Sequence, residues 1–177
     1  YRGRVPERRT QRFAGIKELS YLHPKRFAPD RARAEALGLD PARRNVFVRS
    51  VVWRASHDAG KQGWTPETLR TLVAQLETRF AARVHLSAEG VLPETLAARR
   101  YAGPPEAVHH LLGQCDAYIG ESPTMACEAA ILGVPALLGA PYELGYISAL
   151  VQAGLIDHVS APDSETLLAR LADLPAR

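Results

Sequence analysis

Apolar residues along most of the chain form short runs that alternate with stretches of helical periodicity. The runs lie at 45–53, 83–90, 116–120, 134–139 and 155–159. They are rich in β-branched and other apolar residues and have the length of buried strands. The clearest helical face between them comprises Leu69, Leu72, Val73, Leu76 and Phe80. This alternation of unbroken apolar runs with amphipathic stretches predicts an α/β fold, with a Rossmann-like parallel sheet and helices on both faces.

Residues that start and stop helices stand at the ends of the periodic stretches. Asp30 is expected to cap a short helix that ends at Gly38. Thr65, followed by proline, starts a longer helix, and Asp163 caps the last one. Further helices are expected near 93–100, in the segment ending at Gly113, over 123–132 and near 144–153.

Charge and length divide the chain into two parts. Residues 1–33 carry ten Lys and Arg against three acidic residues, whereas the remainder carries 12 basic and 16 acidic residues. We expect one domain at 30–177, and a basic linker or tail from a missing amino-terminal half at 1–29. A basic arm could bind a polyanion or an anionic membrane surface. A solvated segment, or one that docks on a missing neighbour, is the alternative. No aromatic pattern suited to base stacking accompanies the arginines, so nucleic acid is not the expected partner.

The cysteines and the hydropathy of the chain restrict the compartment and the cofactors that we expect. Cys115 and Cys127 provide neither a disulfide framework nor metal-ligand spacing. No apolar run reaches the about 20 residues that a transmembrane helix needs. We therefore expect a cytoplasmic protein with no transmembrane segment, no metal and no other cofactor. Cys127 is expected to be a small core residue rather than a nucleophile.

Polar residues gather where the predicted strands end, at 54–60, 87–90, 120–124 and 139–145. Open parallel sheets bind ligands beyond the carboxyl ends of their strands, so we expect these segments to meet in one cleft. Ser122 suits the cap of the helix that follows. The N–H groups of Thr124 and Met125 then attract an anion, phosphate above all. Ordinary capping by Ser122 is the alternative.

Glu128 lies one turn beyond Thr124 on the same side of this helix, among small residues. A buried carboxylate is costly unless it is hydrogen-bonded, and the two hydroxyls of a ribose would satisfy both of its oxygens. Phosphate at the helix start and ribose one turn deeper predict a nucleotide site. A salt bridge to Lys or Arg, or plain exposure, is the alternative.

The segment GESPTMACEAAILGVPAL, which begins at Gly120, resembles domain-of-unknown-function family 354. This family is a GT-B-like relative of UDP-N-acetylglucosamine 2-epimerases and glycosyltransferases. Matching phrases occur in the same order at 15–22, 53–60, 87–90, 109–112 and 120–136. The resemblance implies the carboxyl-terminal, nucleotide-binding half of a GT-B fold. It also implies that Ser122 and the Thr124 region hold a diphosphate and that Glu128 holds the ribose.

The resemblance extends to the other strand ends. In the epimerases a His-Arg loop lies beside the diphosphate, which implies phosphate contacts for Arg54, Ser56 and His57. His57 beside Asp58 is also a candidate general acid or base. A polar loop braced by Asp58 is the alternative. Glu89 is a third catalytic candidate, expected to face the sugar unless it lies in an exposed turn.

Some residues depart from the epimerase pattern. Pro123-Thr124 replace a double glycine, and Cys127 stands where the epimerases have a first glutamate. We expect the half that binds a nucleotide sugar, such as a UDP-sugar, of a GT-B-like glycosyltransferase or sugar-nucleotide epimerase-like enzyme whose missing half supplies the acceptor site. The alternatives are a non-catalytic module that binds a nucleotide or nucleotide sugar, and nucleic-acid binding through the basic arm.

Overall fold

A parallel sheet of five strands forms the centre of the protein in a computed structural model, which describes residues 7–9, 11, 13–53, 63–141, 145–160 and 163–174. The strands are β1 (Asn45–Ser50), β2 (Arg83–Ala88), β3 (Ala117–Gly120), β4 (Ala136–Gly139) and β5 (Asp157–Val159). Their order is β2-β1-β3-β4-β5, and every neighbouring pair is parallel. The predicted α/β class with a Rossmann-like sheet is confirmed.

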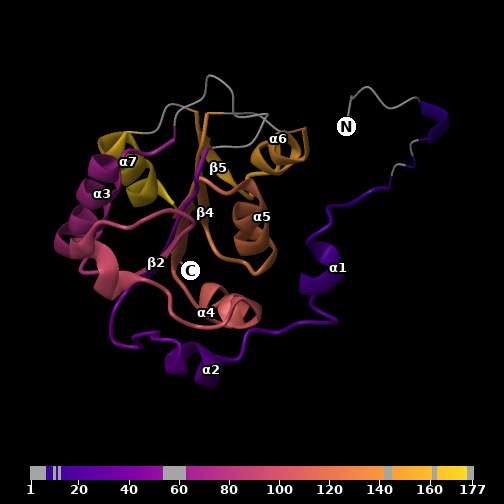
Figure 1. Ribbon diagram of the computed structural model, residues 1–177. Coiled ribbons are helices and arrows are strands. Elements are labelled where there is room, and N and C mark those ends of the chain that lie inside the picture. Colours follow the sequence, from indigo (N-terminus) through magenta and orange to yellow (C-terminus); the bar gives the residue numbers. More distant parts are fainter. Residues whose placement is uncertain are drawn as a thin grey trace.

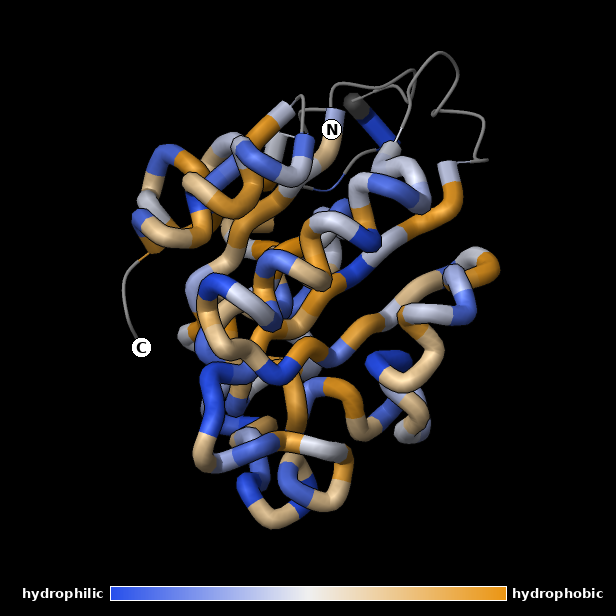
Figure 2. Tube along the Cα trace, turned by 90° about the vertical axis from the view of Figure 1, so that its left-hand side faces the viewer, coloured by the Kyte–Doolittle hydropathy of each residue, from blue (hydrophilic) through white to orange (hydrophobic). Residues whose placement is uncertain are grey.

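Helices cover both faces of the sheet (Figure 1). One layer contains α2 (Arg31–Ala36), α4 (Val108–Leu112), α5 (Pro123–Ile131) and α6 (Gly145–Gln152). The other contains α3 (Pro66–Arg79) and α7 (Ser164–Asp173). Strand residues alternate between the layers: Phe47 and Tyr118 pack with α5, whereas Val48 and Ile119 pack with α3. Figure 2 shows the matching alternation of hydrophobic and hydrophilic residues along the helical turns.

Helix caps form where the sequence predicts them. The side chain of Asp30 accepts a hydrogen bond from Arg33 N at 2.9 Å, and Thr65 Oγ1 accepts one from Thr68 N at 3.0 Å. Asp163 does the same for Thr166 N at 2.8 Å. Each cap satisfies an N–H group that the first helical turn leaves unpaired.

The helix expected near 93–100 is instead a 3₁₀ helix, η3 (Glu94–Arg99). The chain must leave it extended, because Arg100 forms a bridge with Leu86 and Tyr101 N donates to Leu86 O at 2.8 Å. The short span between β2 and this bridge leaves room for tight turns only. A second 3₁₀ helix, η4 (Pro105–Ala107), precedes α4.

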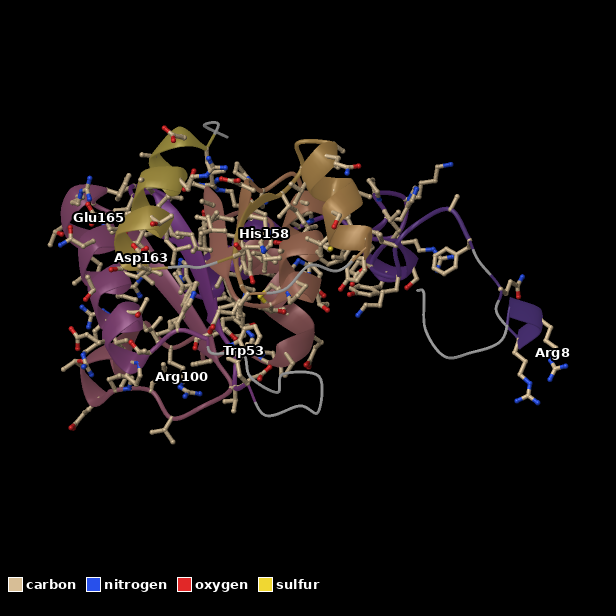
Figure 3. The ribbon with its side chains drawn as sticks, turned by 90° about the horizontal axis from the view of Figure 1, so that it is seen from above. Arg8, Trp53, Arg100, His158, Asp163 and Glu165 are labelled. Atoms are coloured by element: carbon tan, nitrogen blue, oxygen red, sulfur yellow. The ribbon has the colours of Figure 1, made fainter. Side chains whose placement is uncertain are left out.

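The described part of the predicted linker has two different environments. The 3₁₀ helix η1 (Glu7–Arg9) stands away from the sheet, as Figures 1 and 3 show. The short helix α1 (Leu19–Leu22) contacts α5 instead, and its Leu22 is only 2% exposed. This part of the segment therefore packs against the domain, although it forms no strand.

Among the helices that the structure describes, none is long and apolar enough to cross a membrane.

Candidate functional site

The order of the strands reverses between β1 and β3. From β1 the chain proceeds to β2 on one side, and from β3 it proceeds to β4 on the other. In open parallel sheets, ligands bind at such a point, in the crevice beyond the carboxyl ends of the two strands. The residues that follow β1 and β3 are therefore the first place to look for a ligand site.

Glu121 joins the segments that follow these strands. It is 0% exposed, and its Oε1 accepts hydrogen bonds from Trp53 Nε1 at 2.8 Å and Trp64 N at 2.7 Å. Its Oε2 accepts one from Val51 N at 3.1 Å. Burial raises the pKa of this carboxyl, and the hydrogen bonds from Trp64, Val51 and Trp53 offset only part of that effect. Glu121 thus holds both ends of the segment between Trp53 and Trp64 against β3.

Other hydrogen bonds extend this arrangement to the neighbouring strands. Trp64 Nε1 donates to Gly139 O at the end of β4, at 3.1 Å. At the end of β2, Glu89 Oε2 accepts from Val52 N at 3.1 Å. The ends of β1 to β4 are consequently linked, as the expectation of a shared cleft requires. Gly63 has no side chain here because a Cβ atom would overlap the Trp53 indole and Glu121 Oε1.

Glu89 is paired rather than free. Its Oε1 lies 2.5 Å from Arg49 Nη2, and Arg49 Nη1 donates to Ser87 Oγ at 2.7 Å. The carboxylate therefore has a cationic partner on the adjacent strand. A cavity of about 630 Å³ opens beside it, lined by Val52, Glu89, Gly90, Val91, Leu92, Ala97 and Arg100. Figure 3 shows Trp53 and Arg100 on the same side of the molecule.

The start of α5 combines capping with an open donor. Ser122 Oγ accepts from Met125 N at 3.3 Å, so the cap occupies the N–H of Met125. Within the described residues, the N–H of Thr124 has no hydrogen-bond acceptor. Lys17 Nζ donates to Thr124 Oγ1 at 3.4 Å. The helix start thus has one backbone donor and one ammonium group for an anion, in addition to the helix dipole.

Glu128 is buried as expected, with 7% exposure. Tyr21 Oη donates to its Oε1 at 2.7 Å, and His109 Nε2 lies 3.2 Å from the same oxygen. Burial raises the pKa of the Tyr21 hydroxyl, and the bond to Glu128 raises it further. The part of the chain that the structure describes provides no hydrogen bond to Oε2 of Glu128. One oxygen is therefore held in place, and the other is available to a ligand.

His109 and His110 occupy different environments. The ring of His109 packs near Tyr21 and Phe27, with centroids 5.8 and 6.1 Å away. His110 Nδ1 instead accepts from Asp30 N at 3.0 Å. His110 therefore fastens the start of α2, whereas His109 belongs to the surroundings of Glu128.

Cys127 is fully buried beneath α1. Burial raises the pKa of its thiol to about 12, with Glu18 and Glu128 adding to the effect. Such a thiol stays protonated at neutral pH and is a poor nucleophile. Among the described residues, no group of three His, Cys, Asp or Glu side chains could hold a metal ion.

The structure unites some of the predicted site residues and leaves others aside. It brings Ser122, Thr124, Met125 and Glu128 to the cap and first turns of α5 and places Glu89 at the end of β2, two strands away from β3. Arg54, Ser56, His57 and Asp58 lie outside the described residues, so their roles stay predictions. Sequence reasoning missed Glu121, Lys17, Glu18 and Tyr21. The last three belong to the phrase at 15–22, which was the available signal.

The chain matches no protein-family model and no curated protein sequence. The resemblance to domain-of-unknown-function family 354 and to GT-B domains stays a prediction.

Proposed function

We propose that the crevice between β1 and β3 binds a nucleotide, and that the ligand is a nucleotide sugar such as a UDP-sugar. The observation that carries this proposal is Glu128, a buried carboxylate with one oxygen held by Tyr21 and the other without a hydrogen bond among the described residues. It stands one turn beyond an anion-attracting helix start, at a strand-order reversal of a parallel sheet.

The diphosphate is assigned to the start of α5. There the N–H of Thr124, the ammonium group of Lys17 and the helix dipole all favour negative charge. Oε2 of Glu128, one turn deeper, accepts a ribose hydroxyl. The cavity beside Glu89 and Arg100, at the end of β2, is large enough for the glycosyl group.

In a glycosyl transfer, the described residues would act on the leaving group. The bond from the sugar to the diphosphate breaks, and negative charge develops on the departing oxygen. Lys17 and the N-terminal turn of α5 are placed to stabilise that charge before the reaction starts. A GT-B-like enzyme would take its acceptor site from a second half.

A binding module without turnover is the second candidate. The observation in its favour is that Glu89 is paired with Arg49 and that the pKa of Cys127 is about 12. The ion pair engages the Glu89 carboxylate, and a thiol that stays protonated at neutral pH is a poor nucleophile. Turnover of UDP-sugars by the full-length protein separates the two candidates.

A thermal-shift panel of nucleoside diphosphates, nucleotide sugars, free sugars and pyrophosphate tests the proposal. A ligand at a hundred times its Kd stabilises a protein by about 2.7 kcal/mol, which raises the Tm by several degrees. We expect such a shift with UDP or a UDP-sugar and a smaller one with pyrophosphate. Free sugars should give none. A panel in which no nucleotide raises the Tm at millimolar concentration would overturn the proposal.

A further inference from the structure

Glu18 is a buried carboxylate for which the described residues provide no hydrogen bond. The residue is 0% exposed, and neither side-chain oxygen has a hydrogen-bonding partner in the part of the chain that the structure describes. Within that part it forms an ion pair with the adjacent Lys17, whose Nζ lies 3.4 Å from Glu18 Oε1. That ammonium group is two-thirds exposed and also donates to Thr124 Oγ1. Lys17 is therefore shared between the carboxylate and the helix start.

The position of Glu18 follows from the contact between α1 and α5. Lys17 lies against Thr124, and Tyr21 against Glu128. Thr124 and Glu128 lie one turn apart on the same side of α5. Glu18 precedes the first helical residue of α1, and its backbone oxygen accepts from Leu22 N at 2.9 Å. Lys17 Nζ lies 3.4 Å from both Glu18 Oε1 and Thr124 Oγ1, so the Glu18 carboxylate lies at the start of α5, one turn from Glu128. In agreement with this position, the charge of Glu18 adds to the effect of burial in raising the pKa values of Tyr21 and Cys127.

Burial of the Glu18 carboxylate is unfavourable without further hydrogen-bond donors. A buried carboxylate normally accepts several hydrogen bonds or has a desolvated cationic partner. Among the described residues, Glu18 has only the solvated ammonium group of Lys17 as a partner, and the charges of Glu18 and Glu128 both act on Cys127. Donors that arrive with a ligand would satisfy both Glu18 and Oε2 of Glu128.

We propose that Glu18 is a second ribose-binding carboxylate, so that Glu18 and Glu128 each accept a hydrogen bond from one hydroxyl of the ribose diol. This inference rests on the proposed nucleotide site. Tyr21 occupies Oε1 of Glu128, which leaves Oε2 for one hydroxyl, and the other hydroxyl is assigned to Glu18. Because Glu18 is fully covered, the ligand reaches it only when Lys17 and the chain just before α1 move, while the bond from Tyr21 to Glu128 keeps α1 in place.

Calorimetric titration with UDP, its 2′-deoxy and 3′-deoxy forms, and pyrophosphate tests this assignment. The variants are Glu18→Gln and, as a matched control, Glu165→Gln on the exposed start of α7, far from α1 in Figure 3. We expect wild type to bind UDP about tenfold more tightly than at least one deoxy form. Glu18→Gln should weaken UDP binding about tenfold, reduce that preference and leave pyrophosphate affinity unchanged. Glu165→Gln should change nothing.

Other results would overturn the assignment in distinguishable ways. If Glu18→Gln binds UDP like wild type while Glu128→Gln binds it weakly, the role of Glu18 is wrong and the nucleotide site stands. Equal losses for UDP and pyrophosphate would show a structural role. If wild type binds no nucleotide, both proposals fall.

A second measurement does not depend on the variant folding. Hydrogen exchange of the wild-type amides at Leu19 and Ser20, which donate to the backbone oxygens of Ile16 and Lys17, should change when UDP binds, because the segment before α1 must move to expose Glu18. Unchanged exchange, or equal affinity of wild type for UDP and both deoxy forms, would contradict the inference.

Discussion

Replacing Glu121 with alanine should loosen the segments that follow β1 without unfolding the protein. The substitution removes the acceptor of three donors: the main-chain N–H groups of Val51 and Trp64 and the indole of Trp53. A buried donor left without an acceptor costs about 1–3 kcal/mol. These donors are half-buried, and the variant also avoids burying a charge, which offsets part of the loss. We expect a net decrease in the free energy of unfolding of about 2 kcal/mol.

Tryptophan emission reports directly on this change, because Trp53 and Trp64 are the two tryptophans of the chain and both donate to Glu121. Under native conditions Glu121→Ala should shift emission to longer wavelength, and urea unfolding should give the loss of stability. The exposed Glu165→Ala is the control. Unchanged emission together with an unchanged midpoint would refute the role of Glu121.

The difference in stability between wild type and Glu121→Ala should depend on pH, and the pKa of Glu121 gives the sign of that dependence. Burial raises the pKa of Glu121 above its ordinary value of 4.5, so the folded state holds the proton more tightly than the unfolded state. The contribution of Glu121 to stability is therefore complete below pH 4.5 and declines as the pH rises through the raised pKa. The difference in the free energy of unfolding between wild type and Glu121→Ala should be larger at pH 4.5 than at pH 8.

Three further predictions concern other residues. His85 is buried and its pKa is lowered to about 4, so as the pH falls the unfolded state takes up a proton before the folded state does. The free energy of unfolding should therefore decrease by about 3 kcal/mol between pH 6.5 and pH 4. Urea titrations across that range should show a smaller decrease for His85→Gln. Gly63→Ala should displace the Trp53 indole and red-shift the emission; an unshifted spectrum would contradict the close contact. Tyr21→Phe removes the hydrogen bond to Glu128 and should cost about 1 kcal/mol in urea unfolding; no loss would show that α1 is not docked through this bond.

Much of the fold could be predicted because local signals agree with the tertiary structure. The unbroken apolar runs are buried on both faces of the sheet, and caps such as Thr65 and Asp163 start their helices as expected. Where the helix near 93–100 was expected, the chain forms η3. The chain leaves η3 through an isolated bridge of Arg100 with Leu86 of β2, a long-range contact that periodicity does not reveal.

The candidate site was predictable only in part. Burial of Glu128 follows from its small neighbours, but its partner Tyr21 lies 107 residues away in a segment whose charge suggested a linker. Glu121 looked like an ordinary strand-end residue, because its role depends on two tryptophans brought to it by the loop after β1. Glu89 was expected to face a sugar, and its pairing with Arg49 depends on the register of β1 and β2.

The nucleotide site is tested most directly by the affinity of UDP for wild type and Glu128→Gln, measured by calorimetry with Glu165→Gln as the control. Gln keeps an acceptor for Tyr21 and loses the charge that strengthens a hydrogen bond to the ribose. We predict UDP binding to wild type and to the control, and binding to Glu128→Gln that is weaker by about tenfold to a hundredfold, or roughly 1.5–3 kcal/mol. Equal affinity of wild type and Glu128→Gln for UDP, or no binding to wild type, would contradict the account.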